Sequence, residues 1–128
     1  MRAPAWLSRP AIEAMHDELL VEHGGASGLR DAGLLDSALA RARTLHAYGE
    51  ADLFVLAAAT AFGIVRNHPF VDANKRTAFL AAYVFLRVNG LHLVADEADT
   101  VSSMLALAAG ETGEAEFAAW LRASSRAG

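Results

Sequence analysis

Hydrophobic residues recur along most of this chain at the three- and four-residue spacing that places them on one face of an α-helix. The first stripe predicts a helix that begins at Ser8, with a proline in its first turn, and continues to about His23. Residues 24–28 are glycine-rich and predict a short turn-rich connection. A second helix is predicted over roughly residues 34–43, and residues 44–49 are then expected to form a loop or flap.

Two segments in the middle of the chain are apolar on nearly every side. Residues 50–66 and 77–89 both show this pattern, which is typical of helices buried at the centre of a bundle. A polar run, residues 67–76, separates them, and Gly90 is a natural terminator of the second. We therefore expect two central helices joined by a polar loop.

The last third of the chain predicts two more helices. Residues 91–94 form a short extended link, after which Asp96 or Asp99 can cap a helix that runs to about Ala109. Residues 114–122 then close the fold with a further apolar stripe. The whole pattern predicts an all-α protein, a compact bundle of about six helices.

Composition limits the class of protein. The chain has 128 residues, of which 54% are hydrophobic, enough for one core and a single domain spanning residues 1–128. It contains no cysteine, so disulfides cannot support it, and no apolar stretch is long enough to span a membrane. The net charge of −4 argues against direct nucleic-acid binding, which needs a basic surface. We expect a soluble, cytoplasmic protein.

The polar loop concentrates charge where a buried helix is about to begin. Lys75, the single lysine in the sequence, and Arg76 both precede the predicted helix. A helix N-terminus already carries a partial positive charge of about half a unit, so two cations there are unfavourable unless an anion lies among them. Arg76 offers a bidentate fork, Lys75 a point charge and Asn74 an amide donor. These three residues predict a phosphate-binding site.

The same loop holds a candidate base and a candidate metal ligand. His68 is the candidate general base, because an imidazole can accept a proton from an attacking hydroxyl. Asp72 supplies the hard oxygen that Mg²⁺ binds together with substrate phosphates. Purely structural roles remain open for each: Asp72 as a helix N-cap, His68 as a hydrogen-bonded loop histidine, and Lys75 and Arg76 as solvated first-turn residues.

The run HPFVDANKR, residues 68–76, resembles the signature of the Doc branch of the Fic/Doc superfamily, and the similarity extends over essentially the whole chain. The resemblance implies a compact helical Fic fold and an enzyme that uses ATP and Mg²⁺. It further implies a toxin that phosphorylates a threonine of elongation factor Tu, stops translation and is held in check by a cognate antitoxin. By position, the base falls on His68, the metal carboxylate on Asp72, and the phosphate-binding residues on Asn74, Lys75 and Arg76.

Relatives within the superfamily that transfer AMP to a protein hydroxyl are an alternative. They carry glycines where this chain has Ala73 and Lys75, and an arginine where it has Phe79, so the departures favour phosphoryl transfer. The inhibitory helix of some Fic proteins has a spacing that residues 112–116 share, but Phe117 stands where a glycine or asparagine is expected. An ordinary capping role for Thr112 is therefore favoured over self-inhibition.

Two other functions remain open. Arg41 and His46 have the spacing of the catalytic pair in HEPN ribonucleases, another helical toxin family, although that pattern is short and lacks the polar residue that usually follows the arginine. By resemblance, His46 and Tyr48 instead belong to a flap that lines the groove where a target segment docks. An inactive module that binds nucleotide or antitoxin without turnover is the second possibility, and an intact base argues against it.

Overall fold

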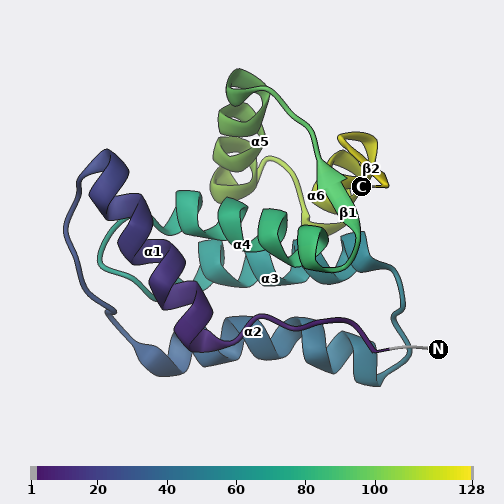
Figure 1. Cartoon of the computed structure of the whole chain (residues 1–128), viewed down its shortest axis with the longest axis horizontal. Helices are drawn as coiled ribbons and strands as arrows, with labels where there is room; N and C mark the ends of the chain where they lie inside the picture. The colour runs from purple at the N-terminus through teal and green to yellow at the C-terminus, as the bar shows by residue number, and fades with distance from the viewer. Residues whose placement is uncertain (1–2, 128) are drawn as a thin grey trace.

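The computed structural model describes residues 3–127, which fold into six helices and one two-stranded antiparallel ladder (Figure 1). The predicted all-α class is confirmed. Strand β2 was not expected, because its short sequence has no strand pattern and it becomes extended by pairing with β1. The helices are α1 (Arg9–His23), α2 (Ala32–Ala47), α3 (Leu53–Asn67), α4 (Asn74–Val88), α5 (Glu97–Ala109) and α6 (Glu114–Ala123); the strands are β1 (Leu91–Leu93) and β2 (Ser125–Ala127).

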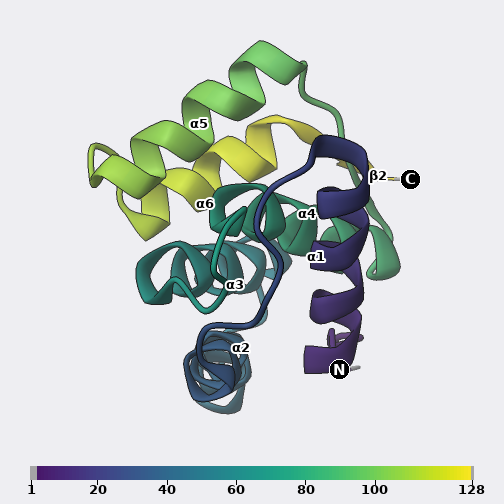
Figure 2. The same cartoon turned by 90° about the vertical axis from the view of Figure 1, so that its left-hand side faces the viewer.

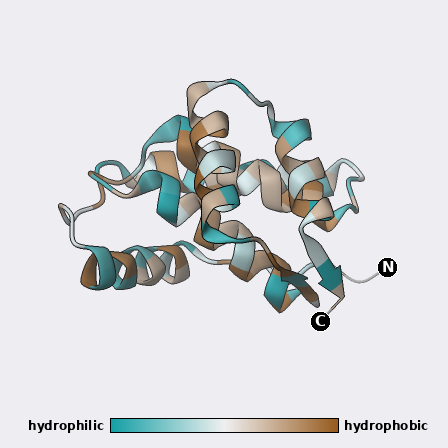
Figure 3. Cartoon of the chain, turned by 90° about the horizontal axis from the view of Figure 1, so that it is seen from above, coloured by the Kyte–Doolittle hydropathy of each residue, from teal (hydrophilic) through white to brown (hydrophobic). Residues whose placement is uncertain are grey.

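Helices α3 and α4 form the centre of the molecule, as the sequence predicted. Residues 56–61 and 63–65 of α3 are all buried. Helix α2 packs on one side of α3, α6 packs on the other, and α1 crosses α4 (Figures 1 and 2). Coloured by hydropathy, the surrounding helices carry both hydrophobic and hydrophilic residues (Figure 3), as expected of helices with one face on a core. No helix among residues 3–127 is long and apolar enough to cross a membrane.

Side chains cap most of the helices at their N-termini. Ser8, Asp31, Asp52 and Asp96 each accept a backbone N–H from the first turn of α1, α2, α3 and α5, respectively. The predicted helix start at Ser8 is therefore confirmed. Of the two candidates for α5, Asp96 is the cap, and it binds the N–H of Asp99 at 2.7 Å.

Three predicted helix boundaries are wrong. Helix α3 begins at Leu53, after its cap Asp52, and not at about residue 50. Helix α2 continues to Ala47, so most of the expected loop at residues 44–49 is helical. Helix α4 begins at Asn74, three residues earlier than expected, because Ala73 adopts a left-handed conformation (φ 62°) that turns the chain directly into the helix. The three residues predicted to bind phosphate, residues 74–76, thus form the first turn of α4.

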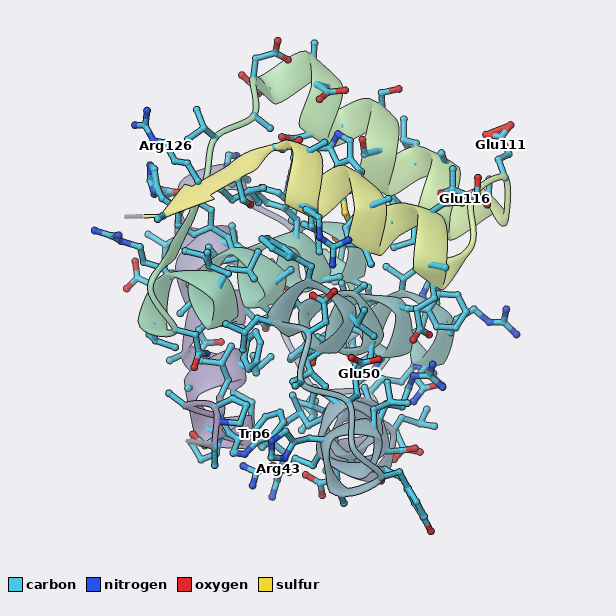
Figure 4. All side chains as sticks on the ribbon, turned by 90° about the vertical axis from the view of Figure 1, so that its right-hand side faces the viewer. Trp6, Arg43, Glu50, Glu111, Glu116 and Arg126 are labelled. Carbon is cyan, nitrogen blue, oxygen red and sulfur yellow. The ribbon has the colours of Figure 1, made fainter. Side chains whose placement is uncertain are left out.

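The segment before α1 is held by hydrogen bonds to Asn89, the residue that follows α4. The side chain of Asn89 accepts the N–H of Ala5 at 2.8 Å and donates to its carbonyl at 3.0 Å. Trp6 packs against Phe85 and His46, with ring centroids 5.8 and 5.6 Å apart, and Arg43 covers its ring at 5.2 Å (Figure 4). Trp6 is therefore an extension of the core.

A glycine allows α2 and α3 to pack with their backbones in close approach. A Cβ atom on Gly63 would lie 2.9 Å from the Ala38 Cα and 3.0 Å from the Ala38 Cβ. The Cα is a backbone atom and the Cβ is bonded directly to it, so neither atom can move away by rotation of a side chain. The spacing of these two helices therefore depends on the missing side chain.

We expect Gly63→Ala to destabilise the protein. Alanine favours a helix by about 1 kcal/mol over glycine, but an overpacked core contact costs about 1–3 kcal/mol, and here the contact is with backbone. Urea unfolding of the two proteins measures the difference in free energy of unfolding. An alanine variant that is more stable than the native chain would show that the helices separate at little cost.

Candidate active site

The loop between α3 and α4, residues 68–73, has a left-handed residue at each end. His68 ends α3 with φ 48° and ψ 58°, and its N–H still donates to the Ile64 carbonyl at 3.1 Å. Ala73, with φ 62°, immediately precedes α4. Such conformations cost a residue with a side chain about 1–3 kcal/mol and concentrate at functional sites. The surrounding contacts must therefore hold both residues in place.

A second segment, residues 24–31, supplies many of those contacts. The N–H groups of Arg30 and Asp31 both donate to the Pro69 carbonyl, at 2.7 and 3.0 Å, and the Val71 N–H donates to the Gly28 carbonyl at 3.0 Å. These bonds make a short antiparallel bridge between this glycine-rich segment and the loop. In Figure 1 the α1–α2 and α3–α4 connections accordingly lie at the same end of the molecule.

The Arg30 side chain fixes the end of α3. Its Nε donates to the His68 carbonyl at 2.7 Å and its Nη2 donates to the Asn67 carbonyl at 2.8 Å. A cation at this position also complements the negative end of the helix. Sequence reasoning missed Arg30, because it lies 38 residues before His68 and outside any motif.

Asn74 is turned inward and holds the loop. It is 7% exposed, its Oδ1 accepts the Phe70 N–H at 3.0 Å, and its Nδ2 donates to the Phe70 carbonyl at 3.0 Å. The two bonds fix the orientation of the amide, which was expected to be free for a phosphate. Its Nδ2 also lies 3.5 Å from His68 Nδ1.

Asp72 is exposed, and both of its oxygens accept a backbone N–H. Oδ1 binds the N–H of Ala73 at 2.8 Å, and Oδ2 binds the N–H of Ala26 at 3.3 Å. These bonds, with the charges of Arg76 and His16, hold the pKa of Asp72 below its ordinary value. The carboxylate is therefore ionised at neutral pH. It is not the N-cap of α4, which has no side-chain cap.

A cleft of about 680 Å³ opens beside this loop. His68, Asp72, Lys75 and Arg76 are all exposed and line one part of it. The N-terminus of α4 opens into the same part, so the end with the positive charges faces the site. The other part is mostly apolar and is formed by α1, α4 and α5, with Leu19, Phe79, Leu80, Val101, Met104 and Leu105 in its walls.

The arrangement suits an anionic ligand with an apolar portion, and comparison with known proteins agrees. Residues 6–86 match the sequence model of the Fic/DOC family. The chain belongs to the Fic/Doc family. The matched region includes the loop, all of α3 and α4 up to residue 86.

Two named relatives refine this assignment. "Protein kinase doc" of Escherichia phage P1 is 35% identical over 117 residues, which cover 91% of this chain and 92% of the relative. "Toxin Doc" of Mycolicibacterium smegmatis is 45% identical over 80 residues, 59% of this chain and 60% of that relative. The predictions of a toxin of the Doc branch and of a kinase-like phosphotransferase, an enzyme that uses a nucleotide, are confirmed.

The segment beside the Fic/Doc loop is not the one expected from the sequence. His46 and Tyr48 were placed in a flap at the active site, but His46 packs on Trp6, and Tyr48 precedes α3 whereas the loop follows it. A helix of this length separates its ends by about 20 Å. Residues 24–31, and not residues 46–48, lie beside the loop.

Two further sequence patterns lie outside the cleft. Arg41 of the HEPN-like pair forms an ion pair with Glu114, while His46 packs on Trp6. In the segment with the spacing of an inhibitory helix, Gly113 is the N-cap of α6, so the capping role expected of Thr112 is wrong, and Glu116 accepts the N–H of Gly113 at 3.0 Å. Glu116 lies near the turn between α5 and α6 (Figure 4), and neither it nor Thr112 lines the cleft.

Gly25 is the point of closest approach between residues 24–31 and the Asp72 carboxylate. A Cβ there would lie 2.9 Å from Asp72 Oδ2, so Gly25→Ala should push the carboxylate from the Ala26 N–H. We expect the pKa of Asp72 to rise toward its ordinary value, measured by a ¹³C NMR titration of the carboxyl group.

Gly28→Ala is the matched control. Its φ of +122° equals that of Gly25 (+121°) within a degree, but its Cβ would meet only Val71 Cγ2 at 3.4 Å. Both variants place an alanine at nearly the same positive φ, and only Gly25→Ala places a Cβ against the carboxylate. Equal titration curves for Asp72 in the two variants would contradict the role given to the Ala26 N–H.

Proposed function

We propose that this chain transfers the γ-phosphoryl group of ATP to a threonine or serine hydroxyl of a protein, with elongation factor Tu as the target, and so inhibits translation. The observation that supports this most directly is the shared cleft. It brings an exposed histidine, an ionised carboxylate and two exposed cations to the N-terminus of one helix. Base, metal ligand and anion-binding groups are the set that phosphoryl transfer needs.

The triphosphate would bind at the first turn of α4. Its backbone N–H groups lack a side-chain cap, and Lys75 and Arg76 add two positive charges. Asn74 would contribute here through its backbone N–H, because its side chain already binds Phe70. The apolar residues that line the cleft would take the base of the nucleotide, which supports a nucleotide such as ATP as the substrate.

The residues present also fit Mg²⁺ bound jointly with the nucleotide. Among residues 3–127 there is no group of three acidic, histidine or cysteine side chains that could hold a metal alone. Asp72 is exposed and ionised, and each of its oxygens keeps a lone pair after accepting one N–H. Mg²⁺ bound in this way neutralises phosphate charge during transfer.

His68 would act as the general base. It takes the proton from the target hydroxyl as the hydroxyl oxygen forms a bond to the γ-phosphorus, while the bond from that phosphorus to the β–γ bridging oxygen breaks and ADP leaves. The Arg30 contact to its carbonyl holds the base at the mouth of the cleft. A base of this kind contributes about 10²–10⁴ in rate.

The residue at position 75 supports attack on the γ-phosphate. A glycine there would leave only backbone N–H groups for the phosphates, whereas Lys75 places a long charged side chain in the cleft. Phe79 is another cleft residue, and it offers no phosphate contact where the AMP-transferring relatives carry an arginine. Both features favour γ-phosphoryl transfer over AMP transfer.

Isotope labelling tests the proposal. We expect label from γ-³²P-ATP, and none from α-³²P-ATP, to enter elongation factor Tu in the presence of Mg²⁺. His68→Ala should lower the rate by about 10²–10⁴ without unfolding the chain, since an exposed residue contributes little to the core. The α label, with a mass gain matching AMP, would instead assign AMP transfer.

His46→Ala is the control for the rival function. It should leave labelling intact, because His46 packs on Trp6 outside the cleft. RNA cleavage that is lost in His46→Ala, with no labelled protein, would favour a ribonuclease. Binding of ATP without transfer to any translation factor would favour the inactive module.

The proposed partner is a small antitoxin whose carboxy-terminal segment covers the cleft. This rests on the name of the toxin relative and on the local capping role of Glu116, which leaves the chain without an internal inhibitor among its described residues. We expect the purified chain to be active alone and to lose activity when the antitoxin is added. A fully repressed chain without partner would contradict this.

A further inference from the structure

His16 lies under the active-site loop, on the face of α1 that packs against it. It is 2% exposed, its Nε2 lies 2.9 Å from the Asp72 carbonyl oxygen, and its ring stacks on Phe70 with centroids 3.9 Å apart and planes 10° from parallel. A carbonyl oxygen can only accept, so Nε2 carries the hydrogen and donates it. The stack fixes the plane of the ring and with it the direction of this bond.

The bond acts on the carboxylate through one peptide plane. In a trans peptide the C=O and the N–H are rigidly opposed, so fixing the Asp72 carbonyl also fixes the N–H of Ala73. That N–H donates to Asp72 Oδ1 at 2.8 Å. A rigid chain of contacts thus runs from the His16 ring, across the peptide bond, to the carboxylate oxygen in the cleft.

We infer that His16 is a positioning residue that orients the Asp72 carboxylate through the peptide bond between Asp72 and Ala73. This inference rests on the proposed function, in which Asp72 meets nucleotide-bound Mg²⁺. Groups that orient a metal ligand by hydrogen bonds typically change metal affinity by about 10- to 100-fold when they are replaced.

A purely structural role would not require an imidazole. A phenylalanine also has an aromatic ring of about this size that can pack against Phe70 in the same buried space. The N–H is what histidine adds, and a buried polar group without its partner is unfavourable. The hydrogen bond to the Asp72 carbonyl is thus what distinguishes His16 from an apolar ring at the same position.

Three variants separate the ring from the hydrogen bond. His16→Phe keeps the ring and loses the donor, whereas His16→Gln loses the ring and keeps an N–H at similar reach. His16→Met is nearly as long as glutamine but has no donor, so the Gln and Met variants form a matched pair. Should the Phe variant not fold, that pair still decides the question.

Amide hydrogen exchange reads the geometry without nucleotide or metal. We expect the Ala73 N–H to exchange about 10-fold faster in the Phe and Met variants and at close to the native rate in the Gln variant. A ten-fold change in exchange rate corresponds to a change of about 1.4 kcal/mol in the free energy that protects this N–H. Unfolding midpoints, measured in parallel, show whether a change reflects general loss of stability.

A Mg²⁺ titration gives the second readout. The Mg²⁺ concentration needed for half-maximal ATP binding, measured by calorimetry, should rise about 10-fold or more in the Phe and Met variants. Glutamine should restore most of the loss. A merely structural His16 would affect the Gln and Met variants equally.

The outcomes distinguish this inference from the proposed function. Unchanged Ala73 exchange in the Phe and Met variants, or a Gln variant no better than Met, would overturn the role of His16. A native chain that binds no Mg²⁺ and ATP would overturn the proposed function, while the Ala73 exchange rates would still decide whether His16 orients the loop.

Discussion

Peptide groups at the junction of two buried helices need hydrogen-bond partners. This requirement determines which segments pack against the loop and what conformation it adopts. The loop at residues 68–73 is too short and too irregular to pair its own N–H and carbonyl groups. Backbone from residues 24–31 and the Arg30 side chain supply the missing partners. The geometry of the candidate site is therefore a property of two segments, of which only one contains the recognisable motif.

The same junction brings together helix ends of opposite polarity. At the end of α3 the exposed carbonyls are neutralised by the Arg30 guanidinium. At the start of α4 no side chain neutralises the N–H groups, and Lys75 and Arg76 add to their charge. The negative end is thus satisfied within the protein, while the positive end is left for a ligand.

Sequence reasoning located the helices and the loop because both leave local signals. Apolar periodicity gave α1, the central pair and the closing helices, and the conflict between charge and burial pointed to residues 67–76. Contacts between distant segments left no such signal. Nothing in the sequence reveals that Arg30 binds the His68 carbonyl, that Asn74 turns inward, or that His16 reaches Asp72 across 56 residues. The early start of α4 was also hidden, because alanine rarely adopts the left-handed conformation of Ala73.

The single lysine also makes the cleft chemically addressable. Lys75 is exposed at its wall, and the sequence contains no other lysine and no cysteine. Among the residues of this sequence, Lys75 is therefore the one side-chain amine on which an amine-selective reagent can act. A fluorophore or crosslinker attached to this amine lies at the wall of the cleft. The native chain can then report on what enters its cleft without any engineered residue.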